Sequence, residues 1–171
     1  IASNGNYQSY GTGIPARGRR VLGVGAYHLQ FHSYVGGQAY GSTTDGRIKP
    51  DLVAPSYTEC ANNLGNESLD YFTGTSGAAP YAGGAAMLLR NWMIVDGTTV
   101  DPGQVYSLMM LAGVNNGAFP PDSRQGVGLI HLPAAGKCQY SKTWVSDGTA
   151  TVDIPIDVPD NPNPQWIRAA L

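Results

Sequence analysis

The chain has 171 residues, close to the size of one domain, so a second complete domain is expected only if both are small. Asp, Glu, Lys and Arg make up 13% of the chain, about half of the ~25% that is usual, so part of the surface is either polar and neutral or covered by something else. The formal net charge of −2 gives no electrostatic footprint for nucleic acid or for an anionic membrane. We therefore expect no nucleic-acid partner and no membrane partner.

The ends and the cysteines bear on how the chain is made. The sequence begins with Ile1 and has no signal peptide, so we expect it to be part of a longer polypeptide. The uncharged stretch 71–89 is interrupted by Pro80 and four glycines, which disfavours a membrane span. Cys60 and Cys138 are too few for a metal site or a disulfide scaffold. One disulfide and two free thiols both stay open.

The first part of the chain predicts short strands separated by turns. Residues 1–18 are rich in Gly, Ser, Asn and Tyr and predict a loop that follows a strand whose start is cut away. The apolar runs 21–26 and 51–55 predict strands of a parallel sheet, the second ended by its proline. Residues 36–49 are rich in turn formers, and 62–68 predict a loop.

Two helices are expected in the middle of the chain. The first begins at Ser76, continues through alanines and leucines, and carries Pro80 in its first turns. The second has Asp101 as N-cap, Pro102 at the first helical position and Gln104 three residues after the cap. Its predicted buried stripe and its stop are Val105, Leu108, Met109, Ala112 and Gly113.

The last part of the chain has a different pattern of apolar and polar residues from the rest. Residues 126–132 predict a final strand, followed by a break. Over 152–158 apolar residues alternate with Asp and Pro, which predicts a half-buried edge strand; a turn at 161–164 and the start of another strand follow. We therefore expect residues 1–136 to form one domain and 137–171 to begin a β-rich C-terminal domain.

The segment 72–80 delivers a serine to the start of the alanine-rich helix. A helix N-terminus presents unpaired backbone N–H groups and the positive end of the helix dipole. An oxyanion beside Ser76 would therefore be stabilised by the N–H of the serine itself. Gly74 and Gly77 leave room for another backbone to approach. A lone serine at this position is otherwise interpreted as a helix cap.

The sequence Gly-Thr-Ser-Gly-Ala-Ala-Pro-Tyr-Ala-Gly-Gly at 74–84 closely resembles the nucleophile signature of subtilisin-like serine peptidases. Three more segments resemble motifs of that family and cover, with the first, residues 1 to about 136: Val-Leu-Gly-Val-Gly-Ala at 21–26, Lys-Pro-Asp-Leu-Val-Ala-Pro at 49–55 and Gly-Val-Gly-Leu-Ile at 126–130. The resemblance implies an α/β fold with a mainly parallel sheet flanked by helices, of which this chain holds the second half.

The resemblance also assigns residues of the site. The segment 2–6, Ala-Ser-Asn-Gly-Asn, resembles the one in which an Asn side chain donates to the oxyanion and the preceding residues wall the pocket before the scissile bond. It implies that Ser76 and Asn6 are catalytic. Without it, Asn6 would be interpreted as a turn residue. The substrate-binding residues that the resemblance implies are Ala2, Ser3, Asn4, Gly5, Gly74 and Thr75.

The catalytic triad of the family runs Asp, His, Ser along the chain, so both partners of Ser76 would lie before Ile1. We therefore expect this chain alone to be inactive, and expect it to pair with the missing N-terminal half of the catalytic domain or to self-associate. The substrate implied is a polypeptide. The resemblance further implies a secreted or periplasmic enzyme without a cofactor, with structural calcium open for the full-length protein and no metal ligands assigned here.

Other interpretations of the same residues stay open. An α/β-hydrolase triad would use Ser76, then Asp96 or Asp122, then His131, but 74–78 lacks the second glycine of the nucleophile elbow. A non-catalytic pseudo-peptidase or partner-binding module would use Ser76 only as a cap, and a His-Gly-Thr motif upstream would argue against it. His28 and His32 have an i, i+4 spacing but no third ligand nearby, which favours ordinary packing or surface roles.

Overall fold

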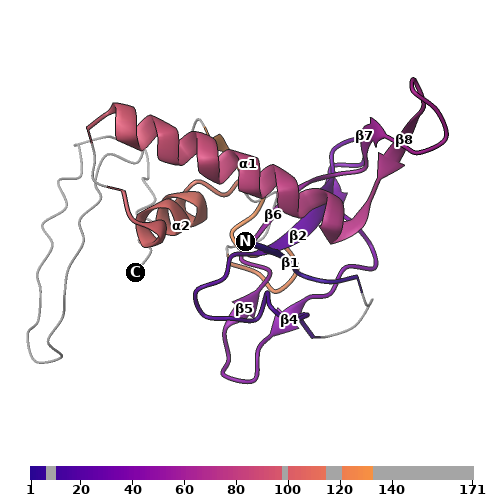
Figure 1. Cartoon of the computed structure of the whole chain (residues 1–171). Helices are drawn as coiled ribbons and strands as arrows, with labels where there is room; N and C mark the ends of the chain where they lie inside the picture. Colours follow the sequence, from indigo (N-terminus) through magenta and orange to yellow (C-terminus); the bar gives the residue numbers. More distant parts are fainter. Residues whose placement is uncertain (7–10, 98–99, 115–120, 133–171) are drawn as a thin grey trace, which may run out of the picture.

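The computed structural model describes residues 1–6, 11–97, 100–114 and 121–132 (Figure 1). The strands and turn predicted beyond residue 137, the domain boundary near Lys137 and Cys138 lie outside these ranges and stay predictions.

A mainly parallel four-stranded sheet forms the centre of the described chain. Strand β2 (Gly23–His28) pairs in parallel with β6 (Leu52–Ser56) along one edge. On its other edge, β2 pairs first in parallel with β1 (Ala2–Ser3) and then antiparallel with β3 (Ser33–Tyr34). The two buried strands predicted from the apolar runs are confirmed, each displaced toward the C-terminus by one or two residues.

The prediction that Pro55 ends β6 is wrong, because the strand continues to Ser56. The N–H of Val53 donates to the carbonyl of Gly128 at 3.0 Å and therefore points away from β2. N–H groups two residues apart point to the same side of a strand, so the one that Pro55 lacks would also point away from β2. The proline therefore removes no hydrogen bond between β2 and β6.

The segment 126–132 follows the other edge of β6 but does not form the predicted strand. Leu129 makes single bridges to Val53 and to Val114, and the N–H of Ile130 donates to the carbonyl of Val53 at 2.9 Å. Gly126 has a φ of 60° and Gly128 has a φ of 106°. These left-handed conformations interrupt the extended backbone that a continuous strand requires.

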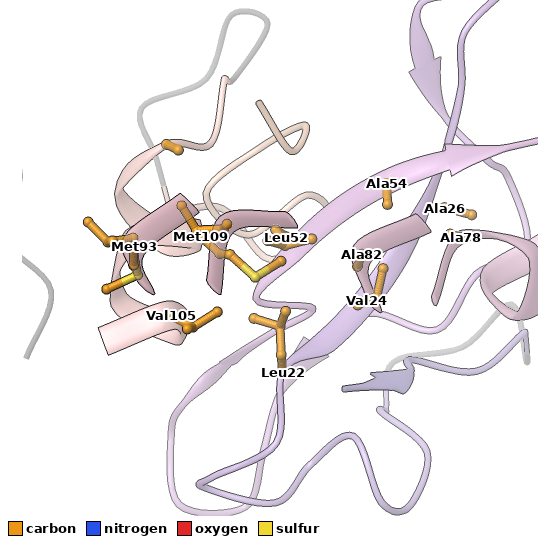
Figure 2. Packing of buried hydrophobic residues seen from close by; sticks show 13 residues of the cluster. Leu22, Val24, Ala26, Leu52, Ala54, Ala78, Ala82, Met93, Val105 and Met109 are labelled. Atoms are coloured by element: carbon orange, nitrogen blue, oxygen red, sulfur yellow. The ribbon is translucent and has the colours of Figure 1, made fainter. Parts of the chain in front are cut away.

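Helix α1 (Gly74–Val95) lies across the sheet and contacts β2 and β6 (Figure 1). It begins two residues before Ser76, which corrects the predicted start, and Pro80 is confirmed inside its second turn. Small side chains let the helix approach the sheet closely, and a second helix, α2 (Pro102–Leu111), packs against the same core. Figure 2 shows the residues of this packing: Leu22, Val24, Ala26, Leu52, Ala54, Ala78, Ala82, Met93, Val105 and Met109.

Helix α2 (Pro102–Leu111) confirms the predicted capping pattern. The side chain of Asp101 accepts from the N–H groups of Gly103 and Gln104, and the side chain of Gln104 accepts from the N–H of Asp101. Gly113 follows the C-cap without a positive φ; a Cβ there would lie 2.5 Å from the side chain of Val127, so the glycine is required for space. Among the described residues, no helix is both long and apolar enough to cross a membrane.

Two hairpins are present that the sequence did not predict. Strands β4 (Gly41–Ser42) and β5 (Ile48–Lys49) form one of them. Strands β7 (Thr58–Ala61) and β8 (Leu69–Phe72) form the other, which encloses the loop expected at 62–68. The β7–β8 hairpin projects beside the N-terminus of α1 (Figure 1). It leads directly into the segment that carries Ser76.

Candidate active site

Ser76 is the third residue of α1 and is exposed. Helix geometry leaves its N–H without an acceptor inside the helix, because only later N–H groups reach back to a helical carbonyl. The N-cap residue is Thr73, whose side chain makes no capping hydrogen bond. Both the hydroxyl and the N–H of Ser76 are therefore at the open, electropositive end of the helix.

Asn6 is brought to this helix end from 69 residues away in the sequence. Its Oδ1 atom accepts from the N–H of Thr75 at 2.9 Å and from the Oγ1 hydroxyl of Thr75 at 3.0 Å. A Cβ on Gly74 would lie 2.9 Å from Nδ2 of Asn6, so the glycine makes room for this amide. Because both hydrogen bonds use Oδ1, the NH₂ group of Asn6 is left as a donor next to the start of α1.

Thr75 and Ser56 fix the backbone around the serine. Thr75 is fully buried, and its Oγ1 also accepts from the N–H of Gly5 at 3.1 Å. Ser56, at the end of β6, donates to the carbonyl of Gly74 at 2.9 Å. These contacts join the loop that follows β1, the end of β6 and the start of α1. Neither role had a signal in the sequence, because each depends on contacts between distant segments.

The residues predicted to wall the substrate pocket have different exposures. Ala2 and Asn4 are buried, whereas Ser3, Gly5 and Gly74 are partly exposed. Asn4 donates from Nδ2 to the carbonyl of Ala39 at 2.5 Å, so its side chain supports the loop from inside. Thr75 likewise faces Asn6 and the protein interior. The assignment of these six residues to a substrate pocket stays a prediction.

A buried ion pair lies between the end of β5 and the start of β6, in the segment 49–55 that resembles a motif of the family. Nζ of Lys49 is 2.5 Å from Oδ2 of Asp51 and donates to the carbonyl of Val21 at 2.8 Å. Asp51 also accepts from the N–H of Gly23 at 2.6 Å and from the hydroxyl of Tyr106 at 2.9 Å. Burial, together with the charge of Asp51, raises the pKa of Tyr106 well above its usual value. The pair thus joins β2 and α2 to the segment that connects β5 with β6.

The model of the subtilase family matches residues 1–128. The chain belongs to the subtilase family. Similar solved structures include the prenylagaramide maturation protease PagA, at 28% identity and a TM-score of 0.63 over 79% of this chain and 48% of that one. The PatG macrocyclase in complex with a peptide is 25% identical, with a TM-score of 0.64, and the match covers 80% of this chain and 42% of that one. The CspB protease of Clostridium perfringens is 29% identical, with a TM-score of 0.61, and the match covers 73% of this chain and 28% of that one.

The comparisons confirm the predicted fold class, an α/β subtilisin-like fold of which part is present. This chain spans less than half of the length of each of these structures. The subtilase fold also removes the α/β-hydrolase alternative. Asp96 lies at the far end of α1, twenty residues after Ser76 and hence about 30 Å away at 1.5 Å per residue. It cannot act on this serine.

Within the described residues, none of His28, His32 and Cys60 of this subtilase belongs to a metal-binding cluster. The ring of His28 packs against Phe31 and Tyr57, and His32 is exposed. The part of the chain that the structure describes contains no group of three or more His, Cys, Asp or Glu residues that could hold a metal ion. Cys60 is exposed on β7 as a free thiol.

Proposed function

We propose that this chain carries the nucleophile and the oxyanion hole of a serine endopeptidase that hydrolyses peptide bonds in polypeptides. The observation that carries the proposal is the pair of hydrogen bonds that Thr75 donates to Oδ1 of Asn6. Two hydrogen bonds from Thr75 hold its side-chain oxygen, which leaves the NH₂ group as a donor at the end of α1 where Ser76 is exposed. Together with the N–H of Ser76, this group forms a pair of donors for an oxyanion.

In the proposed reaction, Oγ of Ser76 attacks the carbonyl carbon of the scissile bond and its proton passes to a histidine. The carbonyl oxygen becomes an oxyanion and accepts from the N–H of Ser76 and from Nδ2 of Asn6. The histidine then protonates the leaving amine, and water hydrolyses the acyl ester. We assign this histidine and its aspartate to the part of the catalytic domain that precedes Ile1.

The surface of α1 supports pairing with that preceding half. Along its length, α1 carries large apolar side chains that expose more than two fifths of their surface to solvent. So many exposed apolar side chains on one helix are unusual for a surface that no other part of the protein covers. These side chains are Tyr81, Met87, Leu88, Trp92, Ile94 and Val95. Without the preceding half, we expect this chain to be inactive and to self-associate. We also propose a secreted or periplasmic location, which rests on the family resemblance and is tested by cell fractionation.

The test is labelling of the full-length protein with a fluorophosphonate probe, followed by intact mass and peptide mapping. We expect a single adduct on Ser76 and cleavage of a polypeptide substrate, both lost in Ser76→Ala with an unchanged melting temperature. Absence of labelling and of cleavage in a correctly folded full-length protein would refute the proposal. That result would favour the non-catalytic, partner-binding alternative.

A further inference from the structure

Four aromatic side chains form a continuous row in which two ring pairs are tilted and one is stacked; we call this row the aromatic shelf. The shelf runs from Phe31 through His28 and Tyr57 to Tyr71, with neighbouring ring centroids 4.3, 4.6 and 5.2 Å apart. Phe31 is 69% exposed, Tyr57 48% and Tyr71 54%. Rings that served only to fill the core would be buried. The shelf therefore presents aromatic surface to a partner.

Backbone strain is concentrated at the same place. His32, next to Phe31, has a φ of 50°, and Tyr57 has a φ of 68°. Within the described ranges, these are the two residues other than glycine with a positive φ. Each such conformation costs about 1–3 kcal/mol, and this kind of strain is found preferentially at binding and catalytic sites. We infer that the positions of the rings, rather than the conformational preference of the backbone, determine the φ angles of His32 and Tyr57.

The hairpin beneath the shelf is acidic. Glu59 pairs with Tyr71 across the hairpin and lies on the same face, whereas Asp70, the residue before Tyr71, lies on the opposite face of β8. From residue 57 to residue 73 there are three acidic residues, with Glu67 in the loop, and no Lys or Arg. A peptide that places an aromatic side chain on the shelf would therefore be favoured when a basic residue is its neighbour.

The shelf is attached to the residues that lead into the nucleophile. The N–H of Tyr57 donates to the carbonyl of Phe72 at 3.2 Å. Its neighbour Ser56 donates to the carbonyl of Gly74 at 2.9 Å, two residues before Ser76. We propose that the aromatic shelf is a substrate-binding site that takes an aromatic side chain, with a basic residue beside it, from the polypeptide that Ser76 cleaves. This inference rests on the proposed peptidase function.

The test uses the full-length protein and peptides in which Phe or Ala occupies one position, moved stepwise outward from the scissile bond. Each peptide is made with Lys or with Glu beside that position. We expect one position at which kcat/KM is roughly tenfold higher with Phe than with Ala, the size of a well-formed aromatic contact. At that position Lys is preferred over Glu, and added salt weakens this second preference.

Variants separate the shelf from general effects on the fold. Tyr71→Ala and, independently, Phe31→Ala should bring the Phe preference close to one, whereas Tyr71→Phe keeps it. Leu69→Ala is the matched control, since Leu69 is 61% exposed on the same strand but outside the shelf. Equal rates for Phe and Ala peptides at every position, or a preference that survives both alanine variants, would overturn the proposal.

Binding to the inactive Ser76→Ala variant distinguishes this proposal from the peptidase assignment. Calorimetry should give a Kd roughly tenfold lower for the Phe peptide than for the Ala peptide, and Tyr71→Ala should remove the difference. Binding without any cleavage by the unaltered protein would refute the peptidase function but retain a peptide-binding shelf. Cleavage without a Phe preference in either measurement refutes the shelf alone.

Discussion

Replacing Thr75 by Val tests whether Thr75 positions Asn6 for the reaction. Valine has nearly the same shape, so the change removes one hydrogen bond to Oδ1 of Asn6 and the acceptor of the Gly5 N–H, while the backbone N–H of residue 75 still donates to Asn6. The partly buried Gly5 N–H then lacks a partner, which costs about 1 kcal/mol of folding free energy. Under the proposed peptidase function, loss of one of two hydrogen bonds that orient Asn6 should lower kcat of the full-length protein by roughly tenfold and leave KM nearly unchanged.

A double-mutant cycle with Asn6→Ala decides the point. If Thr75 acts through Asn6, Thr75→Val lowers kcat in the parent enzyme but has no further effect once Asn6 is Ala. Thr75→Ser keeps the hydroxyl and should retain most of kcat. The measurements are steady-state kinetics on one peptide substrate, with thermal unfolding of each variant as a control. Equal losses of kcat in both backgrounds would refute the positioning role.

Three further predictions concern the scaffold of the full-length protein. Lys49→Met leaves the buried carboxylate of Asp51 without its cation and should lower the free energy of unfolding in urea by about 3–5 kcal/mol. Gly126→Ala places a methyl group against the carbonyl of Asp51 and should abolish soluble expression, whereas Gly46→Ala, which also has a positive φ but open space around it, should cost only about 1–2 kcal/mol. Because burial raises the pKa of Tyr106 above its usual 10.0, the stabilisation that its protonated phenol provides should be complete below about pH 10 and fall as the pH rises further, a dependence that Tyr106→Phe should reduce in unfolding measurements.

The parts of the fold that the sequence predicted are those in which a local pattern decides the structure. The apolar run at 21–26 leads to β2 because a strand covered on both faces needs no alternation. Asp101 and Gln104 cap α2 through contacts within four residues. The β7–β8 hairpin was missed because nearly all of its paired residues are exposed, so neither strand shows the alternation of a half-buried strand.

The residue types of the candidate site were predicted, but its arrangement was not. The resemblance pointed to Ser76 and Asn6 without indicating what holds them together. The link is Thr75, whose contacts join residues 69 and 70 positions apart. A local pattern carries no information about such a contact. The same limit explains why Ser56 was missed, since its partner Gly74 belongs to another element.

The geometry of the helix start gives a physical reason for the order Gly-Thr-Ser. Successive residues of an α-helix point about 100° apart, so the first three residues of α1 face in three directions. Gly74 meets the amide of Asn6, where a Cβ would be too close; Thr75 faces the interior and holds that amide; Ser76 faces solvent. Moving the serine by one position would exchange the buried and the exposed hydroxyl. The three residues therefore act as one unit, in which Thr75, which holds Asn6, and Ser76, which carries the exposed hydroxyl, have to be adjacent.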